Sequence, residues 1–216
     1  MPFVNAEARV RRSVKTLRRQ PRQDRSRERV DQILATAQKL IGEKGLVALA
    51  MVEIASASNM PLASVYHYFP NRTAVIAELY RRFSDRFQLK LKDIAGSITD
   101  AQGIVRATDT IIDGYFEMLK DEPAIQDLLN AVQADKEMLN LDIAQTRVQA
   151  GGFSAKTQHL IAEHHREKFT RSVYLLFQLA GGAVRLALFQ GGEEGERIMA
   201  DFKRLTRAQL AEFDLK

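Results

Sequence analysis

The stretch that decides the fold is MVEIASASNMPLASVYHYFPNRT, residues 51–73. Ala55 is a small residue at the place where two steeply crossing helices can touch. Asn59 follows four residues later, as a residue that tolerates positive φ in a turn. Val65 comes six residues further on and can lock a second helix onto the first. This spacing predicts a helix-turn-helix.

A specific signature follows the turn. Residues 65–72 read VYHYFPNR, and an Ile54-Ala55 pair and a Ser58-Asn59 turn precede them. Together these residues resemble the TetR family of bacterial transcription regulators. The resemblance covers about residues 25–80, and the rest of the chain matches only in length and helical character. It implies a DNA-reading head followed by a larger helical domain that binds a ligand and dimerises.

Three positions depart from the family pattern. Ala50 stands where the family usually has a Thr or Ser that caps the first helix of the motif, so a side-chain cap is lost. Asn59 replaces the usual Gly of the turn. Arg72 replaces a Lys, which keeps the charge and adds a planar fork that can bind phosphate with two hydrogen bonds.

Apolar residues at helical spacing predict about nine helices and an all-α fold. The expected helices are 25–43, 51–57, 62–68, 71–91, 101–120, 124–134, 136–163, 170–190 and 194–213. The pair Gly151-Gly152 predicts a kink, a loop or a close approach inside the long seventh helix, because Gly is unfavourable in a helix interior.

We expect three parts in the chain. They are a basic arm over 1–24, a helix-turn-helix domain over 25–70, and a helical ligand-binding and dimerisation domain over 71–216.

The positive charge is concentrated at the start of the chain. Residues 1–29 hold ten Lys/Arg and three acidic residues, a net charge of +7, although the whole protein carries only +5. Such a segment favours an anionic polymer or surface as partner. Three readings stay open for the arm: a solvated tail, a segment that follows phosphates or enters a groove, and an amphipathic helix on a membrane surface.

Composition also limits the function. The chain has no Cys, which suits a reducing compartment, and no apolar run approaches the 18 residues of a membrane span. We therefore expect a cytoplasmic protein with no membrane span. His159, His164 and His165 lack the spacing of a metal site, and no hydrolase elbow, Walker loop or paired-carboxylate signature occurs. We expect no enzyme, no metal and no cofactor.

The candidate DNA-binding residues combine phosphate contacts with base contacts. The recognition helix carries no Lys or Arg, so methyl contacts, hydrogen bonds and groove shape should read the sequence. By resemblance, Tyr66 and Arg72 are expected to contact phosphate. The full candidate set is Arg25, Arg27, Leu62, Ala63, Ser64, Tyr66, His67 and Arg72.

The resemblance also implies a ligand pocket and a two-fold interface in the C-terminal domain. Candidates for an apolar small-molecule site are Phe83, Phe87, Tyr115, Phe116, Met118 and Phe153, each of which could equally be plain core. Candidates for the interface, on the last two helices, are Val173, Phe177, Gly181, Gly182, Val184, Ile198, Phe202 and Leu205. The two glycines would allow the backbones of two subunits to approach closely.

These expectations describe a homodimeric regulator that binds a near-palindromic site on double-stranded DNA, represses transcription and is released by a small molecule. The competing interpretation is a small-molecule-binding or membrane-peripheral helical protein whose helix-turn-helix is only structural.

Overall fold

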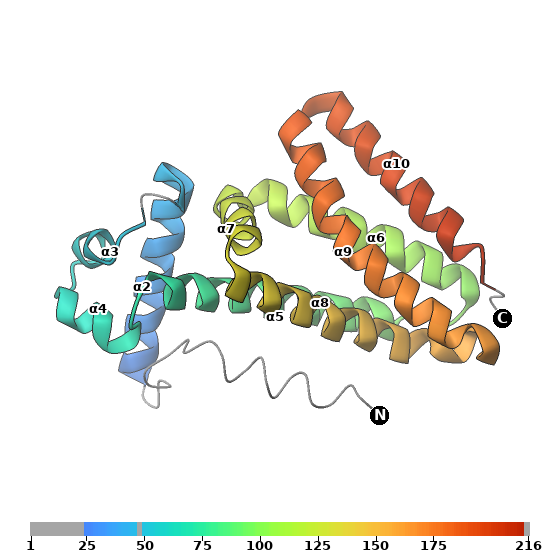
Figure 1. The fold of residues 1–216 in the computed structure, drawn as a ribbon, viewed down its shortest axis with the longest axis horizontal. Helices are drawn as coiled ribbons and strands as arrows, with labels where there is room; N and C mark the ends of the chain where they lie inside the picture. Colours follow the sequence, from blue (N-terminus) through green and yellow to red (C-terminus); the bar gives the residue numbers. More distant parts are fainter. Residues whose placement is uncertain (1–23, 47–48, 214–216) are drawn as a thin grey trace. The chain divides into compact units, whose positions relative to one another are not determined.

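The structure is a computed structural model that describes residues 24–46 and 49–213, and over these residues it is helical throughout (Figure 1). The predicted basic arm lies outside the described residues, apart from Asp24. The helices are α2 (Asp24–Lys44), α3 (Met51–Ala57), α4 (Leu62–Tyr68), α5 (Arg72–Gly96), α6 (Ala101–Asp121), α7 (Pro123–Ala134), α8 (Lys136–Thr157), α9 (Arg166–Gln190) and α10 (Gly192–Leu210). Two 3₁₀ turns, Gln158–Leu160 and Glu163–His165, join α8 to α9.

The all-α prediction is confirmed, and the nine α-helices of the described residues match the expected number. Helix α8 continues through Gly151 and Gly152, so the pair does not form a loop, and the helix ends at Thr157, before the expected end at residue 163. A glycine inside a helix costs only about 1 kcal/mol relative to Ala, which tertiary packing easily overcomes.

The described chain forms two compact units. The first holds the residues up to Asp85 together with Glu122–Ala144, and the second holds Arg86–Asp121 and the residues from Gln145 onward. The boundaries therefore fall inside α5 and α8. The division into functional domains at residue 70 stays a prediction.

In the first unit, α2 is the central support. Its apolar stripe is buried and consists of Val30, Ile33, Leu34, Ala37, Leu40 and Ile41. One side of α2 packs on α3 and another on α7. Gln38 donates a hydrogen bond of 3.1 Å to Glu122, directly before α7. The helix ends where Gly45 adopts a φ of +74°, a conformation that favours glycine.

In the second unit, one apolar cluster joins α5, α6, α8, α9 and the end of α10. Its larger members are Leu91, Ile104, Ile111, Phe153, Phe169, Val173, Leu210 and Phe213. The rings of Phe169 and Phe213 meet edge to face at 5.4 Å. Lys168 donates to Glu212 beside them, and this hydrogen bond lowers the pKa of the Glu212 carboxyl.

Helices α9 and α10 form a tight antiparallel hairpin (Figure 1). Gly191 makes the turn with a φ of +65°. One turn into α10, Gly195 lies so close to the carbonyl of Ala187 that an added Cβ would fall within 3.0 Å of the oxygen. Only glycine fits this contact without a backbone shift.

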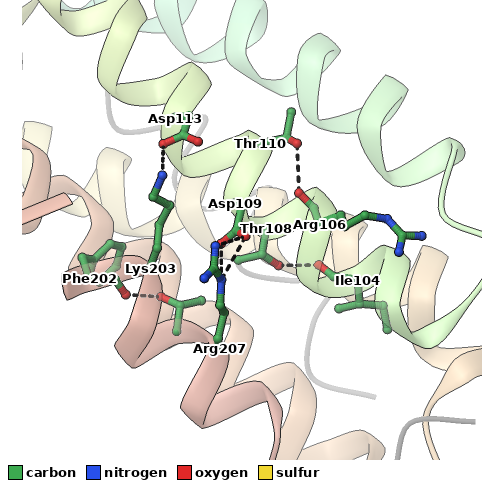
Figure 2. A network of polar contacts seen from close by, with 10 residues as sticks. Ile104, Arg106, Thr108, Asp109, Thr110, Asp113, Phe202, Lys203 and Arg207 are labelled. Atoms are coloured by element: carbon green, nitrogen blue, oxygen red, sulfur yellow. Dashed lines mark hydrogen bonds and ion pairs between the residues drawn. The ribbon is translucent and has the colours of Figure 1, made fainter. Parts of the chain in front are cut away.

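Charged pairs tie α10 to α6 (Figure 2). Arg207 donates two hydrogen bonds from Nε and Nη2 to the carboxylate of Asp109, and Lys203 donates one of 2.8 Å to Asp113. The contact with Asp109 raises the pKa of Arg207. These pairs are largely exposed, so we expect them to orient α10 more than to stabilise it.

Within the described residues, one segment is long and apolar enough to cross a membrane by length and composition alone. It is Glu163–Gln190, which includes all of α9, and only 17% of its most apolar window is buried in the structure. Core helices of soluble proteins can pass the same test. The expected absence of a membrane span therefore stays a prediction.

We predict that Gly195→Ala lowers the free energy of unfolding by about 1–3 kcal/mol, because the new methyl group must push α10 away from the Ala187 carbonyl. Urea unfolding followed by circular dichroism measures the change. Gly114→Ala is the matched control: its Cβ meets no atom within 4 Å, and it should raise stability by up to about 1 kcal/mol. Equal effects of the two substitutions would contradict the close contact.

Candidate nucleic-acid interface

The turn between α3 and α4 has the geometry that the sequence predicts. Asn59 has a φ of +52° and is the one described residue other than Gly with positive φ. The buried hydroxyl of Ser58 donates to the Ile54 carbonyl at 2.6 Å, and the amide of Gln32 on α2 donates to the Ser58 carbonyl at 2.9 Å. These bonds fix the turn to α2.

The contact between α3 and α4 is apolar. Ile54, Ala55 and Val65 are buried at the crossing, and Phe69 closes the end of α4 with no exposed surface. Neither helix has a side-chain cap at its N-terminus, so the departure at Ala50 does remove a cap. At the start of α5, by contrast, Asn71 accepts a hydrogen bond of 2.9 Å from the Ala74 amide.

Packing leaves one face of α4 uncovered. Leu62 and Tyr66 are 39% and 40% exposed, and Ala63 and His67 are exposed beside them. Ser64 is half-buried. The structure therefore presents the predicted groove-facing set on one short helix, and no cation is among them.

Arg72 is placed differently from the expectation. Its Nη2 donates a hydrogen bond of 2.7 Å to the carbonyl of Leu46, in the connection between α2 and α3. Its Nε is buried without a partner among the described groups. Arg72 is half-buried and joins the start of α5 to that connection. A phosphate contact remains a prediction and would have to use the other guanidinium nitrogen.

The cations of the first unit fall into two groups. Lys39 and Lys44 pair with Glu43 and Glu53 at 3.8 and 3.4 Å, which neutralises them within α2 and α3. The exposed side chains of Arg25, Arg27 and Arg29 form no ion pair with another described residue. Among the cations of α2, the uncompensated charge therefore lies on the first turns of the helix.

A buried carboxylate organises the charges where α5 leaves the head. Glu78 is 2% exposed and accepts hydrogen bonds from Arg81, which binds through two nitrogens, and from Arg82 at 3.2 Å. The hydrogen bonds that Arg81 donates to Glu78 raise the pKa of Arg81. Arg82 also pairs with Asp31 on α2 at 2.6 Å, so it fixes α5 to α2.

The ligand-site candidates belong to both units, and their role in a ligand site stays a prediction. Phe83 belongs to the first unit and the other five to the second. Phe87 and Tyr115 contact each other at 5.1 Å between ring centroids, and Phe153 contacts Phe177 at 6.1 Å. Phe116 lies under Lys120, and Met118 is buried elsewhere on α6.

The interface candidates divide between the inside and the outside of the subunit. Val173, Val184 and Phe202 are buried within their own chain, so they offer little surface to a partner, and the interface itself stays a prediction. Gly182 and Leu205 are exposed, and Phe177, Gly181 and Ile198 are half-buried. Sequence reasoning missed four exposed apolar residues of α9, namely Leu175, Leu179, Leu186 and Phe189. Together with Gly182 they recur every three or four residues, and this spacing can be read from the sequence.

The histidines near the start of α9 pack as rings. His165 meets Phe213 edge to face at 5.9 Å, and His164 stacks on His165 at 4.1 Å. No group of three or more His, Cys, Asp or Glu side chains that could hold a metal occurs in the part of the chain that the structure describes.

Two family models match the chain. Residues 33–79 match the model described as "Bacterial regulatory proteins, tetR family", and residues 102–213 match "Tetracyclin repressor-like, C-terminal domain". The first match contains α3 and α4, and the second covers more than half of the chain.

Relatives and solved structures agree with these matches. The HTH-type transcriptional repressor KstR2 of Rhodococcus jostii is 30% identical over 79 residues, which are 37% of this chain. The chain spans about two fifths of the length of the curated relatives it matches. A TetR-family regulator from Streptomyces coelicolor shares the fold with a TM-score of 0.66, 22% identity, and coverage of 85% of this chain and 98% of that one.

A third similar protein is SmeT, the repressor of a multidrug efflux pump in Stenotrophomonas maltophilia. Its structure aligns with a TM-score of 0.65 and 16% identity, covering 87% of this chain and 90% of that one. A complex of SmeT with triclosan aligns with a TM-score of 0.63, 15% identity, and coverage of 87% and 91%. At these identities the likeness shows the fold alone.

We predict that Asn59→Ala lowers the free energy of unfolding by about 1 kcal/mol, since a Cβ is disfavoured at positive φ and Ala lacks the local hydrogen bonds of Asn. Asn59→Gly should stay within about 0.5 kcal/mol of the native protein, because Gly relieves the strain but gains entropy when unfolded. Urea unfolding of the three proteins tests this. If the Ala variant matches the Gly variant, the turn does not require positive φ.

Proposed function

This chain belongs to the tetR family of bacterial regulatory proteins, and from that premise we propose that it represses transcription as a homodimer that binds a near-palindromic operator and is released by a small molecule. The observation that carries the proposal is the uncovered face of α4 in a helix-turn-helix fixed by Asn59 and Ser58.

The exposed side chains of α4 suit the major groove. Leu62 and Ala63 offer apolar contacts to thymine methyl groups, and Ser64 and His67 can hydrogen-bond to base edges or phosphate. The exposed Tyr66 contacts phosphate in this proposal. With no Lys or Arg on α4, recognition depends more on methyl groups and groove shape than on paired hydrogen bonds to guanine.

In this proposal the positive charge that attracts DNA lies outside the recognition helix α4. Arg25, Arg27 and Arg29 are the exposed cations of α2 without an acidic partner among described residues, and they continue the basic composition of residues 1–24. Neutralised Lys39 and Lys44 contribute little. Binding should therefore weaken strongly as salt rises.

A stripe on α9 supports the dimer. Leu175, Leu179, Leu186 and Phe189 are between 50% and 85% exposed, and together with Gly182 they recur every three or four residues on one helix face. The stripe is nearly symmetric about Gly182. A two-fold axis at this glycine would bring the same stripe of a second copy against it and let the two backbones approach.

A second copy fits this stripe better than a bilayer does. The opposite face of α9 is covered by α10, to which it is bound through the close contact at Gly195. Helix α10 carries charged side chains along its length, among them Glu193, Arg197 and Arg204. A membrane span of α9 would have to break this hairpin or bring these charges into the hydrocarbon.

Two-fold symmetry gives the dimer two copies of α4. They can enter successive major grooves about 34 Å, or a multiple of that distance, apart. An effector that binds the C-terminal helices would act by favouring a subunit arrangement that does not fit this spacing. SmeT, which shares the fold, has been crystallised with triclosan, which supports a small apolar effector here.

We propose a cytoplasmic location and no enzymatic reaction, since both matched family models describe regulators. A small-molecule-binding or membrane-peripheral role without DNA binding is the alternative, and the first experiment below separates them.

The native protein should bind a fragment of the DNA upstream of its own gene, as measured by fluorescence anisotropy. Tyr66→Ala should weaken binding about tenfold or more, and Tyr66→Phe shows how much of this loss belongs to the hydroxyl. Arg27→Ala should reduce the slope of log K against log[salt] by about one. No binding by the native protein at low salt, with binding to anionic vesicles instead, would establish the alternative.

Leu179→Arg should convert the dimer to monomers, raising the dimer dissociation constant on the order of 100-fold or more, because two copies of the new charge would be buried at the axis. Sedimentation velocity at several protein concentrations measures the dimer dissociation constant. Leu89→Arg is the matched control, since Leu89 is equally exposed but lies on α5, and this variant should remain dimeric. A dimeric Leu179→Arg protein would rule out the stripe.

A further inference from the structure

Ser154 on α8 is an exception among the buried hydroxyls of the protein. Its side chain is 3% exposed, and its Oγ has no hydrogen-bond partner among the described groups. Ser58, Thr157 and Thr206 are equally buried, and each donates to the carbonyl four residues earlier, at 2.6 to 3.0 Å. Buried polar groups are nearly always paired, so the hydroxyl of Ser154 is directed toward something other than its own helix.

A second polar group without a partner lies across from Ser154. The Nε2 of Gln178 on α9 is buried and has no acceptor among the described groups. Phe153 and Phe177, the residues directly before Ser154 and Gln178, contact each other at 6.1 Å. The contact between these two rings brings the neighbouring positions of Ser154 and Gln178 close to each other.

There is room next to these groups. Gly151 precedes Ser154 by almost one helical turn and is half-buried, yet a Cβ at this position would meet no atom within 4 Å beyond its own helical turn. Gly152 is equally unhindered but lies on the exposed side. Buried Ala150 and Ser154 and half-buried Gly151 are therefore small residues of α8 beside two aromatic rings.

We propose that Gly151, Ser154 and Gln178 form the polar end of the effector site, and that the effector is a small apolar molecule with one hydrogen-bond-acceptor oxygen. Gln178 Nε2 can only donate, and the Ser154 hydroxyl can donate as well, so a single carbonyl or carboxylate oxygen satisfies both. The rings of Phe153 and Phe177 take the apolar part, and the missing side chain of Gly151 leaves space for it. This assignment rests on the proposed ligand response.

The test is a competition assay on the full-length protein. N-phenyl-1-naphthylamine serves as the fluorescent ligand, and three compounds that share one ring system are added to displace it. Naphthalene has no oxygen, 2-acetylnaphthalene has a neutral carbonyl, and 2-naphthoate has a carboxylate. One or both oxygen compounds should bind about threefold to tenfold more tightly than naphthalene, the effect of one ordinary hydrogen bond. The tighter of the two identifies the neutral or the charged form of the acceptor.

Variants connect this preference to the residues. Ser154→Ala and Gln178→Leu should each bring the affinity of the oxygen compounds closer to that of naphthalene. Neither variant should abolish naphthalene binding. Gly151→Leu should weaken binding of all three at least about tenfold, and Gly152→Leu should leave it unchanged. Both leucines replace glycine inside α8, so thermal unfolding should show that both variants are at least as stable as the native chain.

Three results would overturn the site: no displacement in the native protein, an unchanged oxygen preference in Ser154→Ala and Gln178→Leu, or equal effects of the two leucine substitutions. Operator binding by the same variants is measured in parallel without ligand. If the native protein binds the operator but shows none of the expected ligand effects, the site fails while the DNA-binding function stands. If it binds no operator, the proposed function fails whatever the ligand data show.

Discussion

The structure depends on α9 being apolar on both of its long faces. One face carries Val173, Val184 and Ala187 and is buried in the subunit, where α10 approaches so closely that Gly195 cannot bear a side chain. The other face exposes the leucine stripe around Gly182. Exposed patches of this kind mark association sites in soluble proteins, and a helix with two apolar faces is stable in water only when both are covered. The need to cover the outer face supports the proposed dimer, which would present two copies of α4 to DNA.

The first unit separates reading DNA from attracting it. A recognition helix of Leu, Ala, Ser, Tyr and His supplies shape and hydrogen bonds, whereas the cations near it are paired with acids or, like Arg72, bound to a backbone carbonyl. Charge without compensation begins at Arg29 and continues toward the N-terminus. Long-range attraction falls off with salt and is insensitive to sequence, but contacts from α4 are short-ranged and specific. Affinity and specificity can therefore change independently in this protein.

Sequence reasoning succeeded where a residue has only one structural role. Positive φ at Asn59 and the burial of Val65 follow from local stereochemistry, and both are observed. It failed where two faces of a helix carry the same residue types. In α9 the periodicity of Val173 and Val184 fits the core and a partner surface equally well, and only tertiary packing shows that they are core. No local pattern encodes the hydrogen bond from Arg72 to the Leu46 carbonyl or the unpaired hydroxyl of Ser154. Both depend on groups that lie far away in the sequence.

Ligand response and dimerisation share one rigid element in these proposals. Gln178, which would hold the effector oxygen, directly precedes Leu179 of the dimer stripe on α9. A helix transmits a rotation along its length because its backbone hydrogen bonds resist internal twist, so an effector that turns Gln178 must also turn Leu179 and Gly182 at the two-fold axis. Since the stripe packs against its own copy, even a small rotation is repeated by the partner. Coupling of this kind is reciprocal: a ligand that weakens operator binding must itself bind less tightly to the operator-bound dimer, by the same factor.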